Sequence, residues 1–169
     1  NIYIEGGTLT VTGTATAAKC VKAEGDLYLT GGTQTINANG AIDLTDTSDP
    51  SYTAGFKADG SVVLQGATAT VNVNGAAGRG VGATTFTSTS GTLTVTNQGA
   101  LSSNNSSSGY FCTAKGIKAG VVNINGGTIG VTMTGAASKG IKADSGDGDG
   151  NMFITEGTVT VTTRGAGAI

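Results

Sequence analysis

The sequence contains no histidine, a single proline and few charged residues, and each scarcity narrows the kind of protein it encodes. Without histidine the chain lacks the commonest general base and a frequent metal ligand. A formal net charge of −2 gives no basis for nucleic-acid binding. No apolar run approaches the roughly 20 residues of a membrane-spanning helix. These absences disfavour a histidine-based enzyme, a nucleic-acid-binding protein and a membrane-spanning segment.

Glycine is abundant instead, at 30 of 169 residues, while aromatic residues make up only 5% of the chain and charged residues 12%. Helix-type periodicity is absent, and the one proline, Pro50, falls in a loop. Apolar residues alternate with Thr, Asn and Ser, which is the period-two pattern of a β-strand. This composition is typical of a solenoid whose surface carries ladders of Thr and Asn.

The alternating segments belong to an internal repeat. Related motifs occupy residues 19–23, 54–58, 79–83, 115–119 and 139–143. Apolar columns lie six and four residues before, and three residues after, a threonine that follows each glycine corner. These marker threonines are Thr8, Thr33, Thr68, Thr92, Thr128 and Thr158. Repeats of this length indicate a stacked architecture.

The repeat predicts an all-β fold, a parallel β-helix of about six three-strand coils. Each inward residue would then stack on its equivalent in the next coil, at roughly 4.8 Å. Glycine suits the corners because a turn between sheets often needs positive φ. We expect residues 1–169 to form one β-helix domain, a fragment of a longer helix without either polar cap.

Two long insertions, residues 41–53 and 100–113, interrupt the second and fourth coils at the same corner. They are expected to flank the bare corner of the third coil, where Arg79 lies. The result would be a cleft roughly 10 Å across, with Tyr52 and Tyr110 offered from its two walls. Loops on a rigid scaffold are where binding groups collect. The alternative is that the loops are decorative or pack on each other.

Eight of the nine Lys and Arg residues lie in the repeated motif, and stacking should align them in two columns along one edge. Stacked like charges repel, so something must offset them. Glu24, Asp59 and Asp144 follow Lys22, Lys57 and Lys142 by two residues and would form a self-neutralised ladder. The other interpretation is an anionic polymer lying along the edge, with Lys57, Lys115 and Lys118 beside the cleft.

A second candidate site follows the fifth coil, where Asp144, Asp147 and Asp149 alternate with glycine-rich text. Three carboxylates of this kind could bind a hard cation such as calcium, although the spacing is not that of an EF-hand. A solvated turn is the alternative. Cys20 and Cys112 should be about three rungs apart, on the order of 14 Å, which is too far for a disulfide.

Tyr3 and Tyr28 should stack on one outward face of the first two coils. The pair is either a platform for a sugar ring or a cross-rung packing pair that shields the sheet.

The motif at 115–119 that leads into Val122 to Thr128, and residues 1–8, resemble a family of secreted bacterial β-helical carbohydrate-binding proteins. Its characterised members bind polygalacturonate and cellulose and contain calcium. The resemblance covers essentially the whole chain. It implies a right-handed β-helix, a secreted or cell-surface location, polysaccharide binding and no catalysis.

The chain departs from that family just before the Gly-Ile pair of the motif. Many members carry aspartate where this sequence has Lys19, Ala54, Arg79, Lys115 and Lys139. Stacked carboxylates would suit calcium, whereas stacked cations favour an anionic ligand.

The sequence therefore predicts a non-catalytic extracellular module that binds an acidic or plant-type polysaccharide. Its predicted binding residues are Tyr52, Arg79, Tyr110, Lys57, Lys115 and Lys118. No cofactor is required, calcium is an optional ligand, and the chain could belong to a larger surface assembly. The alternative is a structural stalk or adhesin-like scaffold. A polysaccharide lyase, with Arg79 as its base, is the least favoured interpretation.

Overall fold

The computed structural model of the protein describes residues 1–103, 111–146 and 148–165. All regular secondary structure in these residues is β-strand, in one 11-stranded sheet and one separate two-stranded sheet. The strands are β1 (Ile2–Ile4), β2 (Thr8–Gly13), β3 (Lys19–Ala23), β4 (Leu27–Leu29), β5 (Thr33–Ala38), β6 (Ala54–Ala58), β7 (Ser61–Val73), β8 (Arg79–Asn97), β9 (Ser102–Ser103), β10 (Phe111–Cys112), β11 (Lys115–Met133), β12 (Lys139–Ala143) and β13 (Asn151–Thr163). Among the described residues there is no helix of the length and apolarity needed to cross a membrane.

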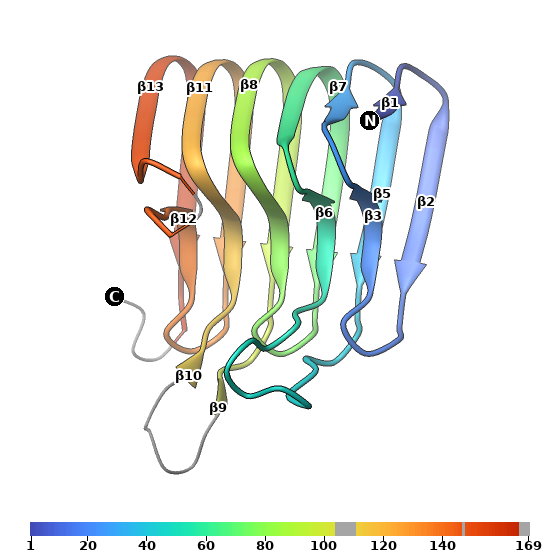
Figure 1. Ribbon diagram of the computed structural model, residues 1–169. Coiled ribbons are helices and arrows are strands. Elements are labelled where there is room, and N and C mark those ends of the chain that lie inside the picture. Colours follow the sequence, from blue (N-terminus) through green and yellow to red (C-terminus); the bar gives the residue numbers. More distant parts are fainter. Residues whose placement is uncertain (104–110, 147, 166–169) are drawn as a thin grey trace.

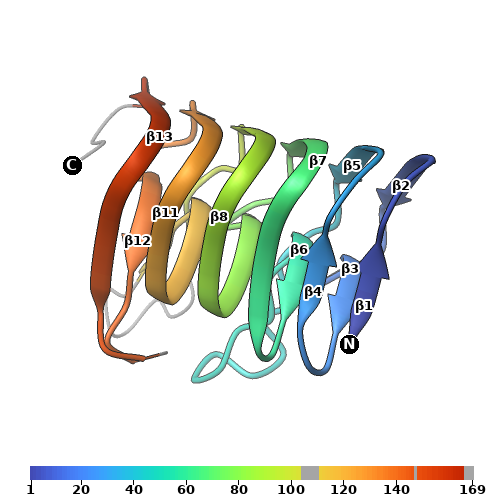
Figure 2. The same ribbon diagram turned by 90° about the horizontal axis from the view of Figure 1, so that it is seen from above.

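The strands of the large sheet are parallel and stack along one axis, from β1 at one end to β13 at the other (Figures 1 and 2). Their register follows the repeat, because each marker threonine pairs with the next, from Thr8 through to Thr158. The apolar column from Ile2 to Met152 pairs in the same way. The all-β class and the parallel stacking are thus confirmed, and the arrangement is consistent with a β-solenoid.

The core consists of the inward columns that the alternation predicted. Phe56 pairs with Val21 on one side and Val81 on the other, and the column continues through Ile117 to Ile141. The central members of this column are fully buried. Because each apolar side chain packs on its equivalents in the neighbouring coils, the core extends along the stack rather than gathering at one centre, and it ends at the last coil, where Met152 and Ile154 are exposed.

The corners differ from the expected three separate strands per coil. In the middle of the stack β7, β8 and β11 run through their corners as continuous strands. Irregular register at Gln65 marks where the ladder between β7 and β8 bends. The glycines before the marker threonines have positive φ, as predicted: Gly7, Gly32, Gly66, Gly91, Gly127 and Gly157. Glycine adopts this conformation without steric cost, so the chain turns while cross-coil bonding resumes after the bend.

The next corner is either a tight turn or a long loop. In three coils it is a short turn with an alanine in the left-handed region, Ala17, Ala77 and Ala137, with φ between 52° and 55°. In the second coil it is the loop before β6, and in the fourth it carries β9 and β10, which pair antiparallel. Cys20 in β3 and Cys112 in β10 are both free, as predicted, although Cys112 lies in a strand and not in a loop.

We predict that Phe56→Ala lowers the free energy of unfolding by about 3–5 kcal/mol, because a fully buried ring would leave a cavity in the column. Thr68→Ala, a substitution at an exposed position of β7, should change it by less than about 0.5 kcal/mol. Urea denaturation of the three proteins measures both values. Equal effects of the two substitutions would contradict this placement of the core.

Candidate functional site

One face of the stack carries the basic residues in two columns. It is formed by β3, β6, β12 and the starts of β8 and β11. The first column contains Lys19, Ala54, Arg79, Lys115 and Lys139, and the second contains Lys22, Lys57, Gly82, Lys118 and Lys142. The predicted alignment of the cations is therefore present in the structure.

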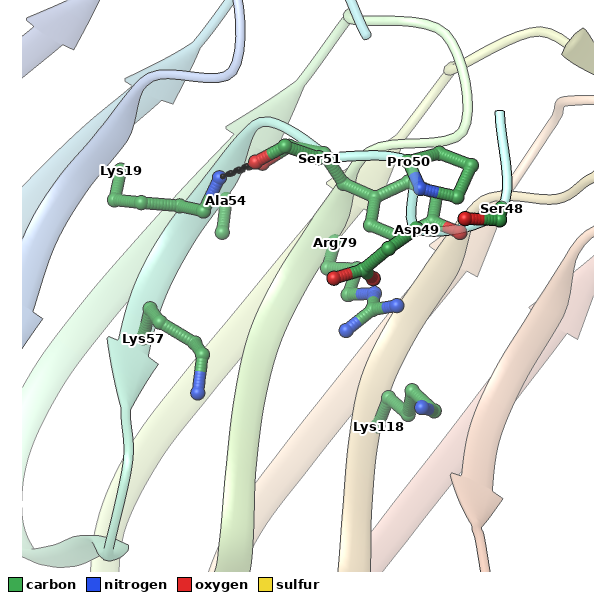
Figure 3. Close-up of a pocket in the computed structure, with 10 residues that line it drawn as sticks. Lys19, Ser48, Asp49, Pro50, Ser51, Ala54, Lys57, Arg79 and Lys118 are labelled. Carbon is green, nitrogen blue, oxygen red and sulfur yellow. Dashed lines mark hydrogen bonds between the residues drawn. The ribbon is translucent and has the colours of Figure 1, made fainter. Parts of the chain in front are cut away.

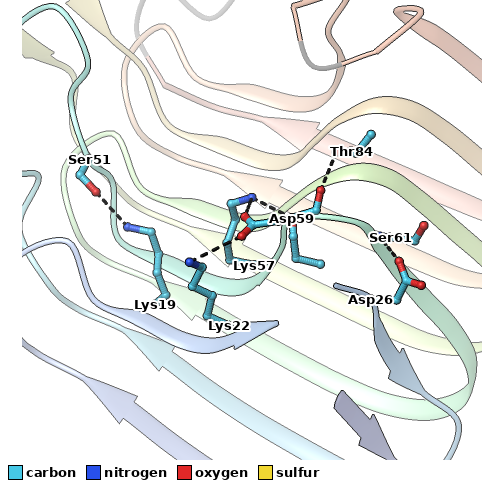
Figure 4. A network of polar contacts seen from close by, with 9 residues as sticks. Lys19, Lys22, Asp26, Ser51, Lys57, Asp59, Ser61 and Thr84 are labelled. Carbon is cyan, nitrogen blue, oxygen red and sulfur yellow. Dashed lines mark hydrogen bonds and ion pairs between the residues drawn. The ribbon is translucent and has the colours of Figure 1, made fainter. Parts of the chain in front are cut away.

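Two carboxylates offset the second column. Asp59 lies 2.9 Å from the Lys57 ammonium and 3.6 Å from that of Lys22 (Figure 4). Asp144 lies 2.6 Å from the ammonium of Lys142 and 3.1 Å from that of Lys118. Hydrogen bonds from Lys57 and Lys142 respectively lower the pKa values of both carboxyl groups.

This pairing differs from the self-neutralised ladder in one respect. Lys22 contacts Asp59 of the next coil, although Glu24 was expected to be its partner. Each carboxylate is thus shared by two lysines, and the cluster of Lys22, Lys57 and Asp59 keeps one excess positive charge. The first column receives no carboxylate within ion-pair distance among the described residues. The face is therefore only partly neutralised by its own side chains.

A cavity of about 430 Å³ opens between the first insertion and this basic face (Figure 3). Loop residues 48–52 form one wall, and the sheet contributes Lys19, Lys57, Arg79 and Lys118. The carboxylate in this lining belongs to Asp49. The cavity thus brings together four cations from four successive coils, which suits a ligand with more than one negative charge.

Arg79 occupies the centre of the lining. Its guanidinium lies over the Tyr52 ring, 4.2 Å from the ring centroid, in a cation–π contact. Its Nε atom is buried and has no hydrogen-bond partner among the residues that the structure describes. Tyr52 donates a hydrogen bond to Cys112 Sγ at 3.7 Å, and burial raises the pKa of its phenol. Tyr52 lines the cavity, and its ring also lies against the guanidinium of Arg79.

Lys19 is a site residue that the sequence analysis did not select. Its ammonium donates to the Ala17 carbonyl at 2.8 Å, to Ser51 Oγ at 3.2 Å and to the carbonyl of Tyr52. These bonds fix the loop against β3, and burial followed by the charge of Arg79 lowers the pKa of Lys19. The sequence did contain a sign of this role, because Lys19, Ala54 and Arg79 share one column. The small side chain of Ala54 leaves room for Lys19 and Arg79 to reach the same cavity.

The other predicted binding residues have different fates. Lys57 and Lys118 line the cavity with Arg79 and Tyr52, whereas Tyr110 lies outside the described residues. Lys115 is next to Arg79 in the first column but donates its hydrogen bond to the Thr113 carbonyl, at 2.6 Å. Burial, with a contribution from Arg79, lowers the pKa of Lys115 to about 8.

The predicted calcium site is only partly visible. Asp144 is engaged by two lysines, Asp149 is exposed, and Asp147 lies outside the described residues. Within the part of the chain that is described, no three acidic or sulfur side chains gather as metal ligands. The carboxylate of Asp144 therefore neutralises lysines here, and calcium binding stays a prediction.

The predicted tyrosine stack is present away from the cavity. The Tyr3 and Tyr28 rings are 4.8 Å apart between centroids and nearly parallel, at 4°. Tyr28 also donates a hydrogen bond to Asp26 at 3.1 Å. The two rings cover each other, so the geometry favours the cross-rung packing pair.

Comparison with known protein families adds a finding about the first part of the chain. The model of a family described as "Carbohydrate-binding domain-containing protein" matches residues 1–78 of the 169. The matched part includes the cavity loop, Lys19 and Lys57, and it ends immediately before Arg79. Searches of curated proteins and of solved structures found no match. The family match supports a carbohydrate-binding role and does not specify the carbohydrate.

The lowered pKa of Lys115 has a consequence for stability. Between about pH 8 and its ordinary value of 10.5, the unfolded chain holds a proton on Lys115 that the folded chain has released. The contribution of Lys115 to folding stability should therefore rise with pH across this window.

The measurement is urea denaturation of the wild type and Lys115→Met at about pH 7 and about pH 10. The difference between the two proteins should move in favour of the wild type at the higher pH. Lys139→Met, which removes an exposed lysine from the same column, controls for the loss of one cation. A pH-independent difference for Lys115→Met would show that its amine is not desolvated.

Proposed function

We propose that this protein is a non-catalytic module that binds an acidic polysaccharide along its basic face, with the Arg79 cavity at the centre of the site. The observation that carries the proposal is the guanidinium of Arg79. It is held by Tyr52, flanked by Lys57 and Lys118, and has no carboxylate partner among the described residues. A carboxylate or ester anion on a glycan would supply the missing counter-charge.

The arrangement of charge favours a polymer over a single small anion. The cations of the first column continue beyond the cavity, from Lys19 through Arg79 and Lys115 to Lys139. Coils are spaced by about 4.8 Å, so an extended chain along the stack would meet a new cation every one or two rungs. The family match adds independent support for a carbohydrate as the polymer.

The proposal includes no catalytic step. Lys115, with a pKa of about 8, is the described residue closest to a general base at neutral pH. However, its ammonium is turned to the Thr113 carbonyl, and Lys115 is not among the residues that line the cavity. A base must reach the proton that it abstracts. The position of Lys115 therefore favours polysaccharide binding over polysaccharide cleavage.

The wider setting is part of the same proposal. We infer one right-handed β-helix, a location outside the cell or on its surface, and no requirement for calcium. A rigid stack of coils with a charged face suits attachment to an extended polysaccharide, because the binding groups are already in line before the ligand arrives.

The test is affinity electrophoresis with polygalacturonate and with neutral glucans, at low and high salt and with and without calcium. The wild type should be retarded by polygalacturonate at low salt and released at high salt. Arg79→Ala should raise the dissociation constant about tenfold or more, which is the usual effect of losing a charged hydrogen-bond donor.

Arg164→Ala is the matched control, because this exposed arginine follows β13 on another face and should not affect retention. Release of unsaturated products would instead indicate a lyase. Absence of retention by any glycan would overturn the proposal and leave the repeat as a structural scaffold.

A further inference from the structure

Gly82 interrupts the second cationic column. The other four members of that column are Lys22, Lys57, Lys118 and Lys142, and Gly82 pairs directly with Lys57 on one side and Lys118 on the other. The motif of this coil, 79–83, thus keeps its arginine and loses the lysine that would stand three residues later. The column has a gap at the level of Arg79.

The backbone does not require glycine at this position. The φ angle of Gly82 lies outside the left-handed region, and an added Cβ would meet Lys57 Cδ at 3.5 Å and Arg79 Cδ at 3.8 Å, which are ordinary contacts. A side chain could therefore be accommodated without strain. Because Gly82 has no side chain, a space remains above the sheet between Lys57 and Lys118.

That space is a hollow of about 90 Å³, which we call the Gly82 notch. It is lined by Lys57, Arg79, Gly82, Ala83, Thr84 and Lys118. The lining contains three cations from three successive coils and no carboxylate. Figure 3 shows the Arg79 guanidinium between the Lys57 and Lys118 side chains. Thr84 Oγ1 donates to the Asp59 carbonyl, at 2.8 Å, so its proton is already used.

The carboxylates near the notch stay with their lysines. Asp59 is ion-paired with Lys57 and Lys22, and Asp144 is ion-paired with Lys118 and Lys142. Each carboxylate is therefore already shared between two lysines. Asp49 lines the larger cavity but not the notch. The buried Nε of Arg79 has no hydrogen-bond partner within the described part of the chain. Because Arg79 has no carboxylate partner among the described residues, the notch keeps the positive charge of its guanidinium.

We propose that the Gly82 notch binds one tetrahedral oxyanion, a sulfate or phosphate ester, carried by the polysaccharide. This inference rests on the proposed function and specifies the anionic group. Such an ester presents three terminal oxygens in different directions, which matches cations placed on two sides and in the middle. A carboxylate presents two oxygens in one plane and is satisfied by a single guanidinium fork. The adjoining cavity, which shares Lys57, Arg79 and Lys118, would take the sugar that carries the ester.

The experiment compares one glucan backbone carrying different anions: dextran sulfate, dextran phosphate, carboxymethyl-dextran and unmodified dextran, at equal degree of substitution. At about pH 5 a phosphate ester carries close to one negative charge, since its second pKa is about 6, so the esters can be compared at similar charge. The wild type should bind at least one of the two esters about tenfold more tightly than carboxymethyl-dextran, and the stronger arm identifies which ester.

The decisive variant is Gly82→Lys, which adds a positive charge and also fills the notch. If the notch binds the ester, Gly82→Lys should weaken binding of the preferred dextran ester about tenfold. If a diffuse positive face is all that matters, the extra charge should strengthen it. Gly82→Ala is the matched control, since its Cβ fits at ordinary contact distances and should change affinity less than about twofold. Thermal unfolding of both variants checks that they fold.

Two results would overturn the inference: equal affinity for carboxymethyl-dextran and both esters, or tighter ester binding by Gly82→Lys. If polygalacturonate is still retained in either case, the proposed function stands and only the notch assignment fails. If no acidic glycan is bound, both proposals fail.

Discussion

The constraint on which the structure depends is the in-register backbone pairing between coils. Each residue lies beside its equivalent in the next coil, at a spacing of about 4.8 Å. Apolar residues therefore pair with apolar residues along a whole column, from Ile2 through Phe86 to Met152. The same pairing aligns the outward residues of each motif with those of the next coil, so the five copies of the motif form one continuous face.

This pairing is unfavourable for charged residues, because it places equivalent lysines of neighbouring coils side by side, where their charges repel. The structure offsets the cost in two ways. Asp59 and Asp144 each bridge two lysines of neighbouring coils, and Ala54 and Gly82 remove a cation from a column. Arg79 lies next to these residues, in contact with Tyr52, and no carboxylate of the described part of the chain pairs with it. The unbalanced charge at this coil is the physical basis of both proposals.

The repeat made most of the fold predictable. Spacing around the marker threonines gave the apolar columns, the parallel register and the positive φ of the glycine corners, because each depends on residues close in sequence. The separate three-strand coils were wrong in the middle of the stack, since β8 and β11 bend without breaking. At the site, alignment of the lysines followed from the register, but the pairing of Lys22 with Asp59 did not. A lysine side chain is long enough to pair with a carboxylate of the neighbouring coil, and the spacing of residues within one coil does not reveal such a pair.

The sequence by itself determined the all-β class, the stacking and which residues share a column, because backbone pairing transmits a local pattern unchanged from coil to coil. Only the tertiary structure decided what the side chains do within those columns. It placed Tyr52 over Arg79, turned Lys115 toward the Thr113 carbonyl and brought Lys19 into the cavity wall. It also showed that Gly82 leaves a hollow. The contacts of Tyr52, Lys115 and Lys19 depend on how the two irregular insertions fold back on the regular face, and no periodicity constrains those loops.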